Sequence, residues 1–260
     1  MRANTAAGIH FYQFESFNRT DLAHGVFARH GGVSPPPFAS LNMSVSVGDR
    51  YENVRENRSR AFRALGRAPD SVADLWQVHS ADVIVAEAPR GSREYLAKAD
   101  ALITDRPEVT LFLRFADCVP ILLFDPKRRV AGVAHAGWRG TLSKAAAVTA
   151  RAMVAQYHCR PADIVAGIGP SIGPCHYEVG PEVVEQTRAV FPDDADELLI
   201  PVNSHYHLDL WAANACSLRA MGVEQIEIGR VCTACNTVDF FSHRGEHGQT
   251  GRFGALIALQ

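Results

Sequence analysis

The stretch VTLFLRFADCVPILLFDPKRRVAGVAH, residues 109–135, decides the fold that this chain is expected to adopt. Apolar side chains recur at every second position from Val109 to Phe115, which is the period of a β-strand. Two further apolar runs, residues 121–124 and 130–134, follow after short connections. The stretch therefore predicts three successive strands.

The junctions of these strands carry two chemically reactive side chains. Cys118 stands between Asp117 and Pro120, and a proline interrupts the hydrogen-bond ladder of a strand, so we expect the thiol to be exposed at a break. His135 ends the third strand and precedes a glycine-rich turn. Functional side chains are often presented at the ends of such rigid elements.

Helical patterns lie on both sides of this stretch. One helix is expected between Asp49 and Gly66, because apolar residues there share one helical face. The turn after His135 predicts the start of another helix, which continues to Met153. Further patterns predict strands at 164–168, 226–228 and 253–259 and helices at 181–190 and 210–221.

Strands and helices are thus interleaved, yet several strands follow one another directly. This mixture predicts the α+β class, with mixed sheets covered by helices. Of the 260 residues, 47% are apolar and 21% are charged, which is typical of a globular chain. No low-complexity linker divides it, so we expect a single domain over residues 1–260, with residues 1–20 as a variable N-terminal segment.

The charge balance and the apolar pattern restrict the partners. A formal net charge of −2 gives no basic field that could neutralise many phosphates, so a nucleic-acid partner is not expected. The N-terminus lacks an apolar signal core, and the apolar runs are shorter than a membrane span. We therefore expect a cytoplasmic protein without a membrane partner. The chain also lacks a GxGxxG motif and a P-loop.

The six cysteines, at positions 118, 159, 175, 216, 232 and 235, are too sparse for a disulfide framework. Free thiols are expected. Cys232 and Cys235 have the CxxC spacing, but a zinc ribbon needs a second such pair, and the sequence has none. On this argument we do not expect a metal role for the pair.

Three side chains form a candidate metal set: His79 after Gln77 and Val78, Cys118, and His135. Two imidazoles and one thiolate are typical of a catalytic zinc site, because three protein ligands leave the fourth tetrahedral position open. Their separation in the chain is too large for a short metal motif. From the residues alone, each histidine could be an ordinary polar group and Cys118 a buried small hydrophobe.

Six phrases in a fixed order resemble the YfiH-like family. This family has long been labelled the laccase-domain or multicopper polyphenol oxidase family, and its members are now regarded as purine nucleoside phosphorylases. The resemblance extends from about Gly25 to the C-terminus. The phrases lie at Arg29–Ser34, Gln77–His79, Ala116–Pro120, His135–Gly140, Gly169–Pro174 and Phe240–Arg244.

The resemblance implies a metal centre and a fold. It assigns His79, Cys118 and His135 as Zn²⁺ ligands, and Cu²⁺ is the other metal that we consider. The implied fold has four layers, α/β/β/α, with mixed sheets, similar to the catalytic domain of cytotoxic necrotizing factor toxins. One departure is His176 after Cys175, where relatives often carry a second cysteine. We therefore leave Cys175 out of the metal set.

The resemblance also implies an activity. The implied reactions are phosphorolysis of adenosine, inosine, guanosine and methylthioadenosine, and deamination of adenosine. The partners are then small purine nucleosides and phosphate, and we expect a monomer. Cys118 and His135 are the expected catalytic residues, with Asp117 beside them. Alternation along a strand points Asp117 away from Cys118, which favours an orienting role for it over that of a base.

Phosphorolysis requires an anion pocket. Arg139, with the amides of Gly140 and Thr141 at a helix N-terminus, is the first candidate, although Arg139 could equally pair with a carboxylate. Arg58 and Arg244 are weaker candidates. His243 is a candidate acid or base, and aromatic side chains such as Trp138 could stack on a purine.

Two other function classes remain open. Cys118 and His135 could act as nucleophile and base of an amide hydrolase, for which a cell-wall precursor is the implied substrate. A copper-dependent polyphenol oxidase is the second alternative. Laccase chemistry normally needs a dense set of histidines around several coppers, and one His-His-Cys set does not supply it.

Overall fold

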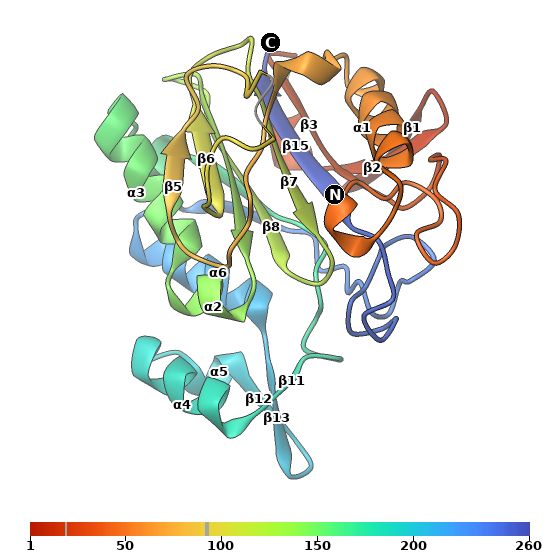
Figure 1. Ribbon diagram of the computed structural model, residues 1–260. Helices are drawn as coiled ribbons and strands as arrows, with labels where there is room; N and C mark the ends of the chain where they lie inside the picture. The colour runs from red at the N-terminus through yellow and green to blue at the C-terminus, as the bar shows by residue number, and fades with distance from the viewer. Residues whose placement is uncertain (19, 92–93) are drawn as a thin grey trace.

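Two six-stranded mixed sheets pack face to face and form the centre of the molecule (Figure 1). The computed structural model describes residues 1–260 except residues 19, 92 and 93. The first sheet has the order β1 (Arg2–Ala6), β2 (Ile9–Gln13), β3 (Leu22–Phe27), β15 (Phe253–Leu259), β7 (Thr110–Phe115), β4 (Val72–Ala73). The second has the order β14 (Gln225–Ile228), β10 (Val165–Ile168), β8 (Val119–Asp125), β9 (Val130–Ala136), β6 (Ala101–Thr104), β5 (Val83–Val85).

Both sheets combine antiparallel and parallel pairs, as the interleaved pattern predicts. In the first sheet β4 runs parallel to β7, and all other neighbouring strands of this sheet are antiparallel. In the second sheet β5 is parallel to β6 and β14 is parallel to β10. The expected mixed α+β class is therefore confirmed.

Helices cover the outer face of each sheet. The helix α1 (Tyr51–Ala64) packs on the first sheet, while α3 (Ala145–Tyr157) and α6 (Leu210–Ala220) pack on the second. The result is a layered α/β/β/α arrangement, visible in Figure 1. Its likeness to the cytotoxic necrotizing factor domain stays a prediction. None of the described helices combines the length and apolar character that a membrane crossing demands.

The hydrophobic core is divided by the pleat of β7. Phe112 faces outward and packs with Phe62 of α1, with ring centroids 5.1 Å apart. Leu111 and Leu113 point to the opposite face and pack between the two sheets. Both faces of the strand are buried, so the apolar residues of β7 contribute to two different cores.

The chain changes sheets between β7 and β8. These strands are consecutive in the sequence, but β7 belongs to the first sheet and β8 to the second. The crossover is Ala116, Asp117 and Cys118, and Asp117 adopts a left-handed backbone with φ of 80°. The expected interruption at Cys118 is therefore confirmed, and its physical cause is the passage between two layers.

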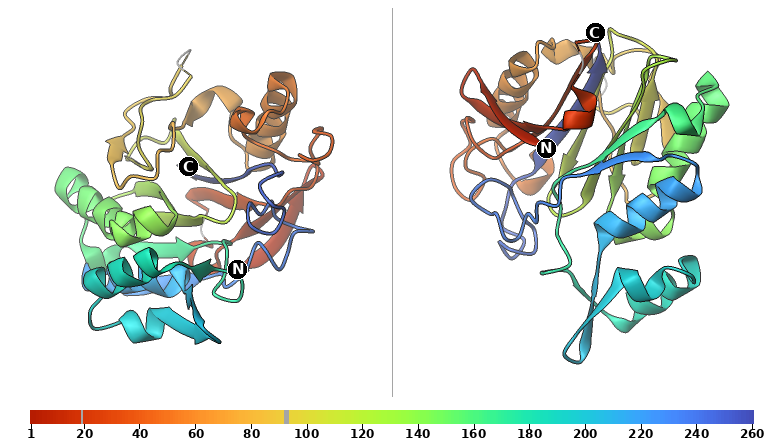
Figure 2. Two further views of the ribbon diagram at one scale, coloured as in Figure 1. Left: turned by 60° about the horizontal axis from the view of Figure 1, so that its bottom comes forward. Right: turned by 180° about the vertical axis from the view of Figure 1, so that it is seen from behind.

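A small antiparallel unit lies at one end of the second sheet. Its strands have the order β11 (Glu178–Val179), β13 (His205–Leu208), β12 (Leu199–Val202), and they adjoin α4 (Pro181–Val190) and α5 (Ala195–Leu198). Figures 1 and 2 show this teal unit projecting below the sheets. Short 3-10 helices lie at Glu15–Phe17, Val45–Val47, Pro69–Ser71 and Pro161–Asp163.

Two sequence-based predictions differ from the structure. The helix expected from the turn after His135 to Met153 is two helices, α2 (Trp138–Leu142) and α3, because Lys144 adopts a left-handed backbone with φ of 55°. Residues 1–20, expected as a variable segment, contain β1 and β2, which extend the first sheet at its edge. Whether this segment varies stays a prediction.

Candidate active site

The structure brings His79, Cys118 and His135 together. Their ligand nitrogen and sulfur atoms all lie within 4.8 Å of one another. Nε2 of His79 is 4.0 Å from Sγ of Cys118, and the two imidazole rings have centroids 5.0 Å apart. A loop supplies His79, the crossover between the sheets supplies Cys118, and β9 supplies His135. Residues distant in the chain thus form one cluster.

Asp100 holds both histidines of this cluster in place. Its carboxylate is fully buried, and Oδ1 lies 2.8 Å from Nδ1 of His135. Oδ2 accepts hydrogen bonds from the backbone amides of Val78 and Ser80, at 3.0 and 2.7 Å, on either side of His79. Nε2 of His135 therefore remains for a ligand. Asp100 was not predicted from the sequence, because a single acid before an apolar run forms no recognisable motif.

Gly137 leaves room for the cluster. A Cβ atom at this position would lie 2.9 Å from Sγ of Cys118 and 3.3 Å from Cδ2 of His79. The first distance is shorter than real Cβ contacts, so a side chain here would displace the sulfur. The glycine of the His135–Gly140 phrase therefore has a steric role beside the thiol.

The charges of Cys118, His135 and Asp100 stabilise one another. Burial alone would raise the pKa of Cys118, but the charge and hydrogen bond of His135, together with His79, lower this pKa to about 6. Burial alone would lower the pKa of His135, whereas Cys118 and Asp100 raise it to about 9. Cys118 is therefore a thiolate at neutral pH, which is the form that binds metals or attacks carbon.

The donor set fits a metal ion. Two imidazoles and one thiolate suit Zn²⁺ and also copper, and the buried Asp100 provides the carboxylate–histidine contact that usually supports a ligating imidazole. Three protein ligands would leave a fourth tetrahedral position open for water or substrate. Their assignment as metal ligands stays a prediction.

A pocket of about 570 Å³ opens above the cluster. This volume lies within the range of small-molecule sites. Aromatic side chains and three arginines surround it. Besides the cluster and Asp117, the lining consists of Ser44, Ser46, Trp76, Gln77, Tyr95, Arg114, Ala116, Trp138, Ile172, Tyr177, His243, Arg244 and Arg252.

Asp117 anchors the segment that forms one wall of this pocket. Its Oδ1 accepts hydrogen bonds from the hydroxyls of Thr233 and Ser242, both at 2.7 Å. Its Oδ2 accepts the backbone amide of Arg244 at 2.6 Å. Both carboxylate oxygens are thus occupied by donors of this segment. A catalytic role for Asp117 stays a prediction.

The predicted anion site at the start of α2 has a different environment. Gly140 and Thr141 are buried, and the amide of Thr141 donates to the carbonyl oxygen of Gly137. The guanidinium of Arg139 lies 4.2 Å from the centroid of the Trp138 ring. Arg139, Gly140 and Thr141 are not among the described residues that line the pocket. Phosphate binding by these three residues stays a prediction.

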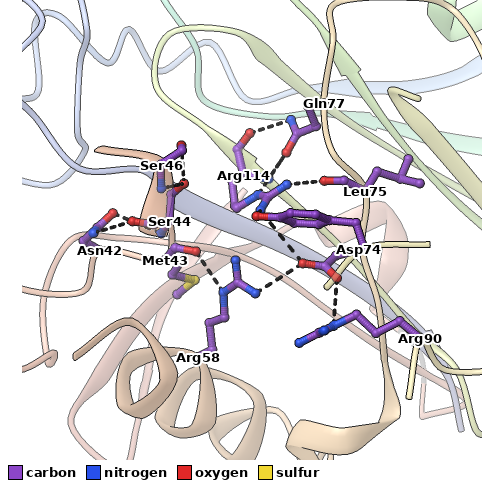
Figure 3. A network of polar contacts seen from close by, with 11 residues as sticks. Asn42, Met43, Ser44, Ser46, Arg58, Asp74, Leu75, Gln77, Arg90 and Arg114 are labelled. Atoms are coloured by element: carbon purple, nitrogen blue, oxygen red, sulfur yellow. Dashed lines mark hydrogen bonds and ion pairs between the residues drawn. The ribbon is translucent and has the colours of Figure 1, made fainter. Parts of the chain in front are cut away.

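Arg58 lies in a buried ion network rather than on the pocket wall (Figure 3). Its Nη1 is 3.2 Å from Oδ2 of the fully buried Asp74, and Nε of Arg90 is 3.0 Å from Oδ1. Burial lowers the pKa of Arg58 to about 10. Three arginines surround one carboxylate, since Arg114 also lies within 3.9 Å of Asp74. Arg244, in contrast, does line the pocket.

The same network positions the loop that carries His79. Oε1 of Gln77 accepts hydrogen bonds from the amide and from Nε of Arg114, and Nε2 of Gln77 donates to the carbonyl of Arg114 (Figure 3). Arg114 in turn donates to the carbonyl of Leu75. Gln77 is thus tied to β7 by three hydrogen bonds, which hold the loop two residues before His79.

A second cluster of possible metal ligands lies outside the first one. Cys175, His176, Cys232 and Cys235 have ligand atoms within 4.8 Å of one another. Cys175 lies outside the group of His79, Cys118 and His135, as expected. Cys232 and Cys235 lack a second CxxC pair, but Cys175 and His176 complete a four-residue group with them, and whether this group holds a metal is not settled by these distances. The missing partners come from another loop, which sequence spacing could not reveal.

Comparisons with known proteins agree with this architecture. Residues 23–260 match the family model described as multi-copper polyphenol oxidoreductase laccase. A relative from Geobacillus stearothermophilus, named purine nucleoside phosphorylase YlmD, is 39% identical over 90% of this chain and 88% of its own. A Deinococcus radiodurans protein named purine nucleoside phosphorylase is 40% identical over 92% of this chain and 89% of its own.

Solved structures show the same fold. The crystal structure of YlmD from Geobacillus stearothermophilus matches with a TM-score of 0.92 and 36% identity, covering 99% of this chain and 98% of the other. The crystal structure of the Bacillus licheniformis hypothetical protein YfiH matches with a TM-score of 0.91 and 33% identity, covering 98% and 97%. The chain therefore belongs to the multi-copper polyphenol oxidoreductase laccase family, which includes the YfiH and YlmD proteins.

Proposed function

We propose that this chain is a zinc-dependent purine nucleoside phosphorylase that accepts adenosine, inosine, guanosine and methylthioadenosine and also deaminates adenosine. The observation that carries the proposal is the soft cluster of His79, Cys118 and His135 at a pocket of about 570 Å³. The names of the relatives support the same reaction class. We further propose that the chain acts as a cytoplasmic monomer, as its composition suggests.

The walls of the pocket suit a purine nucleoside. Trp76 and Tyr95 meet edge to face, with ring centroids 5.6 Å apart, and Tyr177 lies on the lining as well. Trp76 is 49% exposed, which leaves ring surface available for a planar base. Aromatic faces of this kind hold a purine by stacking. The hydroxyls of Ser44 and Ser46 add polar contacts suited to a ribose.

Arg252 and Arg244 are the phosphate ligands that this pocket supports. Burial of Arg252 lowers its pKa. The nearby charges of Cys118 and Asp117 raise this pKa, so the guanidinium lies close to the first cluster. Arg244 carries its side chain over the ring of Tyr177, 5.5 Å from the centroid. One guanidinium can donate to two phosphate oxygens at once, so two arginines on the pocket lining suit inorganic phosphate.

The reaction breaks the bond between ribose C1′ and the purine nitrogen. A phosphate oxygen forms the new bond to C1′, the electron pair of the broken bond leaves with the base, and the base takes up a proton. His243 is the lining imidazole outside the metal set, so we assign proton delivery to it. The products are free purine and ribose 1-phosphate.

Zn²⁺ bound by His79, Cys118 and His135 would supply a Lewis acid at the base of the pocket. Deamination converts adenosine and water to inosine and ammonia, with a C–O bond formed and a C–N bond broken at C6 of the purine. An open three-ligand set is the observation that favours this second reaction. Asp100 would support deamination by holding the His135 imidazole in one tautomer.

Amide hydrolysis is the alternative function that a specific observation favours. Cys118, His135 and Asp100 follow one another in contact, which is the order of a nucleophile, a base and an orienting acid. A cell-wall precursor would be its substrate. A polyphenol oxidase is less well supported, because two histidines and one cysteine do not make up the histidine-rich set of a laccase.

One assay with two variants tests the proposal. Purified protein is incubated with adenosine or inosine, with and without phosphate, and free base, ribose 1-phosphate and inosine are quantified. We expect base release only with phosphate, loss of activity and of the pocket metal in Cys118→Ala, and full activity in Cys216→Ser. Cys216 lies on α6, outside both metal-type clusters. Base release that is independent of phosphate would contradict phosphorolysis.

A further inference from the structure

We propose that Cys175, His176, Cys232 and Cys235 bind a second, structural Zn²⁺ that clamps one wall of the active-site pocket. This site is separate from the cluster of His79, Cys118 and His135, and it goes beyond the proposed reaction. The four ligand atoms come from two loops, one between β10 and β11 and the other between β14 and β15.

The spacing of the four atoms is that of a tetrahedral site. Sγ of Cys175 lies 3.5 Å from Sγ of Cys235, and Nδ1 of His176 lies 3.3 Å from each of these two sulfurs. Sγ of Cys232 is 3.8 Å from Nδ1 of His176. With Zn–S bonds of about 2.3 Å and Zn–N bonds of about 2.0 Å, tetrahedral geometry places neighbouring ligands about 3.5–3.8 Å apart. The four distances above lie within a few tenths of an ångström of this spacing, and all four ligand atoms lie within 4.8 Å of one another.

The composition of the group indicates a structural rather than a catalytic ion. Three thiolates and one imidazole complete four-coordination, whereas a catalytic site keeps one position open. Cys232 and Cys235 have the two-residue gap that is common in structural zinc sites. Cys232 is buried and its Sγ accepts the backbone amide of Gly173 at 3.2 Å, a contact that supports a metal-bound thiolate.

The two loops of the site are already paired next to the ligands. Ser171 forms a parallel bridge with Cys232. The amide of Ser171 donates to the carbonyl of Val231, and the carbonyl of Ser171 accepts the amide of Thr233. An ion bound at the four ligands would join these loops a few residues further along. Because a structural metal contributes binding energy to folding, the ion would hold the loops together.

The clamp acts on residues that face the substrate pocket. Tyr177 directly follows His176 and lines the pocket, as does Arg244. Nη1 of Arg244 donates to the carbonyl oxygen of His176 at 3.4 Å, and its backbone amide donates to Asp117 beside Cys118. The second ion would therefore fix Tyr177 and Arg244 relative to the first cluster, although no atom of its site touches the reacting atoms.

A disulfide is the competing use of these cysteines. The Sγ atoms of Cys175 and Cys235 are 3.5 Å apart, and both thiols are free in the structure. A disulfide would engage two of the four side chains and leave Cys232 and His176 without a function. Convergence of all four side chains on one point favours the metal.

Metal content tests the proposal directly. Protein purified under reducing conditions is loaded with Zn²⁺ and desalted, and zinc and protein are quantified. We expect about two ions per chain in the wild type, as the two clusters imply, and about one in Cys235→Ser, Cys175→Ser and Cys118→Ala. Cys216→Ser is the matched control and should keep both ions. One ion in the wild type that only Cys118→Ala removes would overturn the proposal.

Cobalt substitution identifies which site is filled. In Cys118→Ala loaded with Co²⁺, we expect the absorption of tetrahedral cobalt with thiolate charge-transfer bands, and we expect Cys235→Ser in that background to abolish them. Mass spectrometry without added reductant tests for the competing disulfide. A disulfide between Cys175 and Cys235 in the reduced, metal-loaded preparation, or a Co²⁺ spectrum unaffected by Cys235→Ser, would contradict the metal site.

Discussion

The Oδ1 atom of Asp100 lies 2.8 Å from Nδ1 of His135, and both side chains are buried. The other carboxylate oxygen accepts the amides that flank His79. One carboxylate thus sets the tautomer of one imidazole and the loop conformation of the other. Asp100 therefore contacts both histidine positions of the candidate metal centre, although it does not belong to the ligand group itself.

Asp100→Asn is expected to lower the zinc affinity of the first cluster by about 10–100-fold, because the carboxylate that orients His135 becomes a neutral amide. Competition with a chelator of known affinity measures this change, and phosphorolysis should fall with metal occupancy. Asp82→Asn is the control, since this exposed acid lies next to the same loop. Equal affinities for Asp100→Asn and the wild type would refute the orienting role.

Gly137→Ala is expected to weaken metal binding and to lower the free energy of unfolding by about 1–3 kcal/mol, since its Cβ would lie 2.9 Å from Sγ of Cys118. Denaturant unfolding and zinc analysis measure the two effects. Gly180→Ala is the matched control, because a Cβ at Gly180 meets nothing within 4 Å. A Gly137→Ala protein with wild-type zinc content would show that the sulfur moves at little cost.

Arg252→Gln is expected to raise the KM for phosphate by at least about tenfold with little change in the KM for the nucleoside, because a partly buried cation of the pocket is removed. Arg139→Gln tests the sequence-based assignment in the same assay. Arg139 lies on Trp138 and outside the described lining, so we expect nearly unchanged constants. The reverse pattern would place phosphate at the start of α2 instead.

Alkylation of Cys118 in the metal-free protein is expected to follow a thiolate with a pKa of about 6. The rate should therefore fall as the pH drops below about 6 and reach a plateau above it. His135→Asn removes the positive partner, so the midpoint should move upward toward the ordinary thiol pKa of 9.0. Peptide mapping by mass spectrometry measures the rate at Cys118 separately from other cysteines. An unchanged midpoint in His135→Asn would contradict the charge coupling.

Local patterns were sufficient for much of the secondary structure. The alternation before Cys118 and the apolar runs after it correspond to β7, β8 and β9, and the helix expected between Asp49 and Gly66 is α1. Strand and helix preferences depend on side chains a few residues apart, so such elements can be read from the sequence. The family motifs likewise identified His79, Cys118 and His135 as one group.

Longer-range relationships were not accessible in this way. The short strands β4, β5 and β11 have too few residues to show a period, and their position depends on partner strands. Lys144 divides α2 from α3 although the apolar pattern continues across it. In each case the contacts made in the folded chain outweigh the local preference.

By itself, the sequence determined the α+β class, the central strands and the three members of the first cluster. Only the tertiary structure decided that β7 and β8 lie in different sheets, that Asp100 supports His135, and that four side chains from two loops form a second cluster. The physical reason is that a side chain's local preference is set by its neighbours in the chain, whereas a binding site is set by which layers and loops pack together.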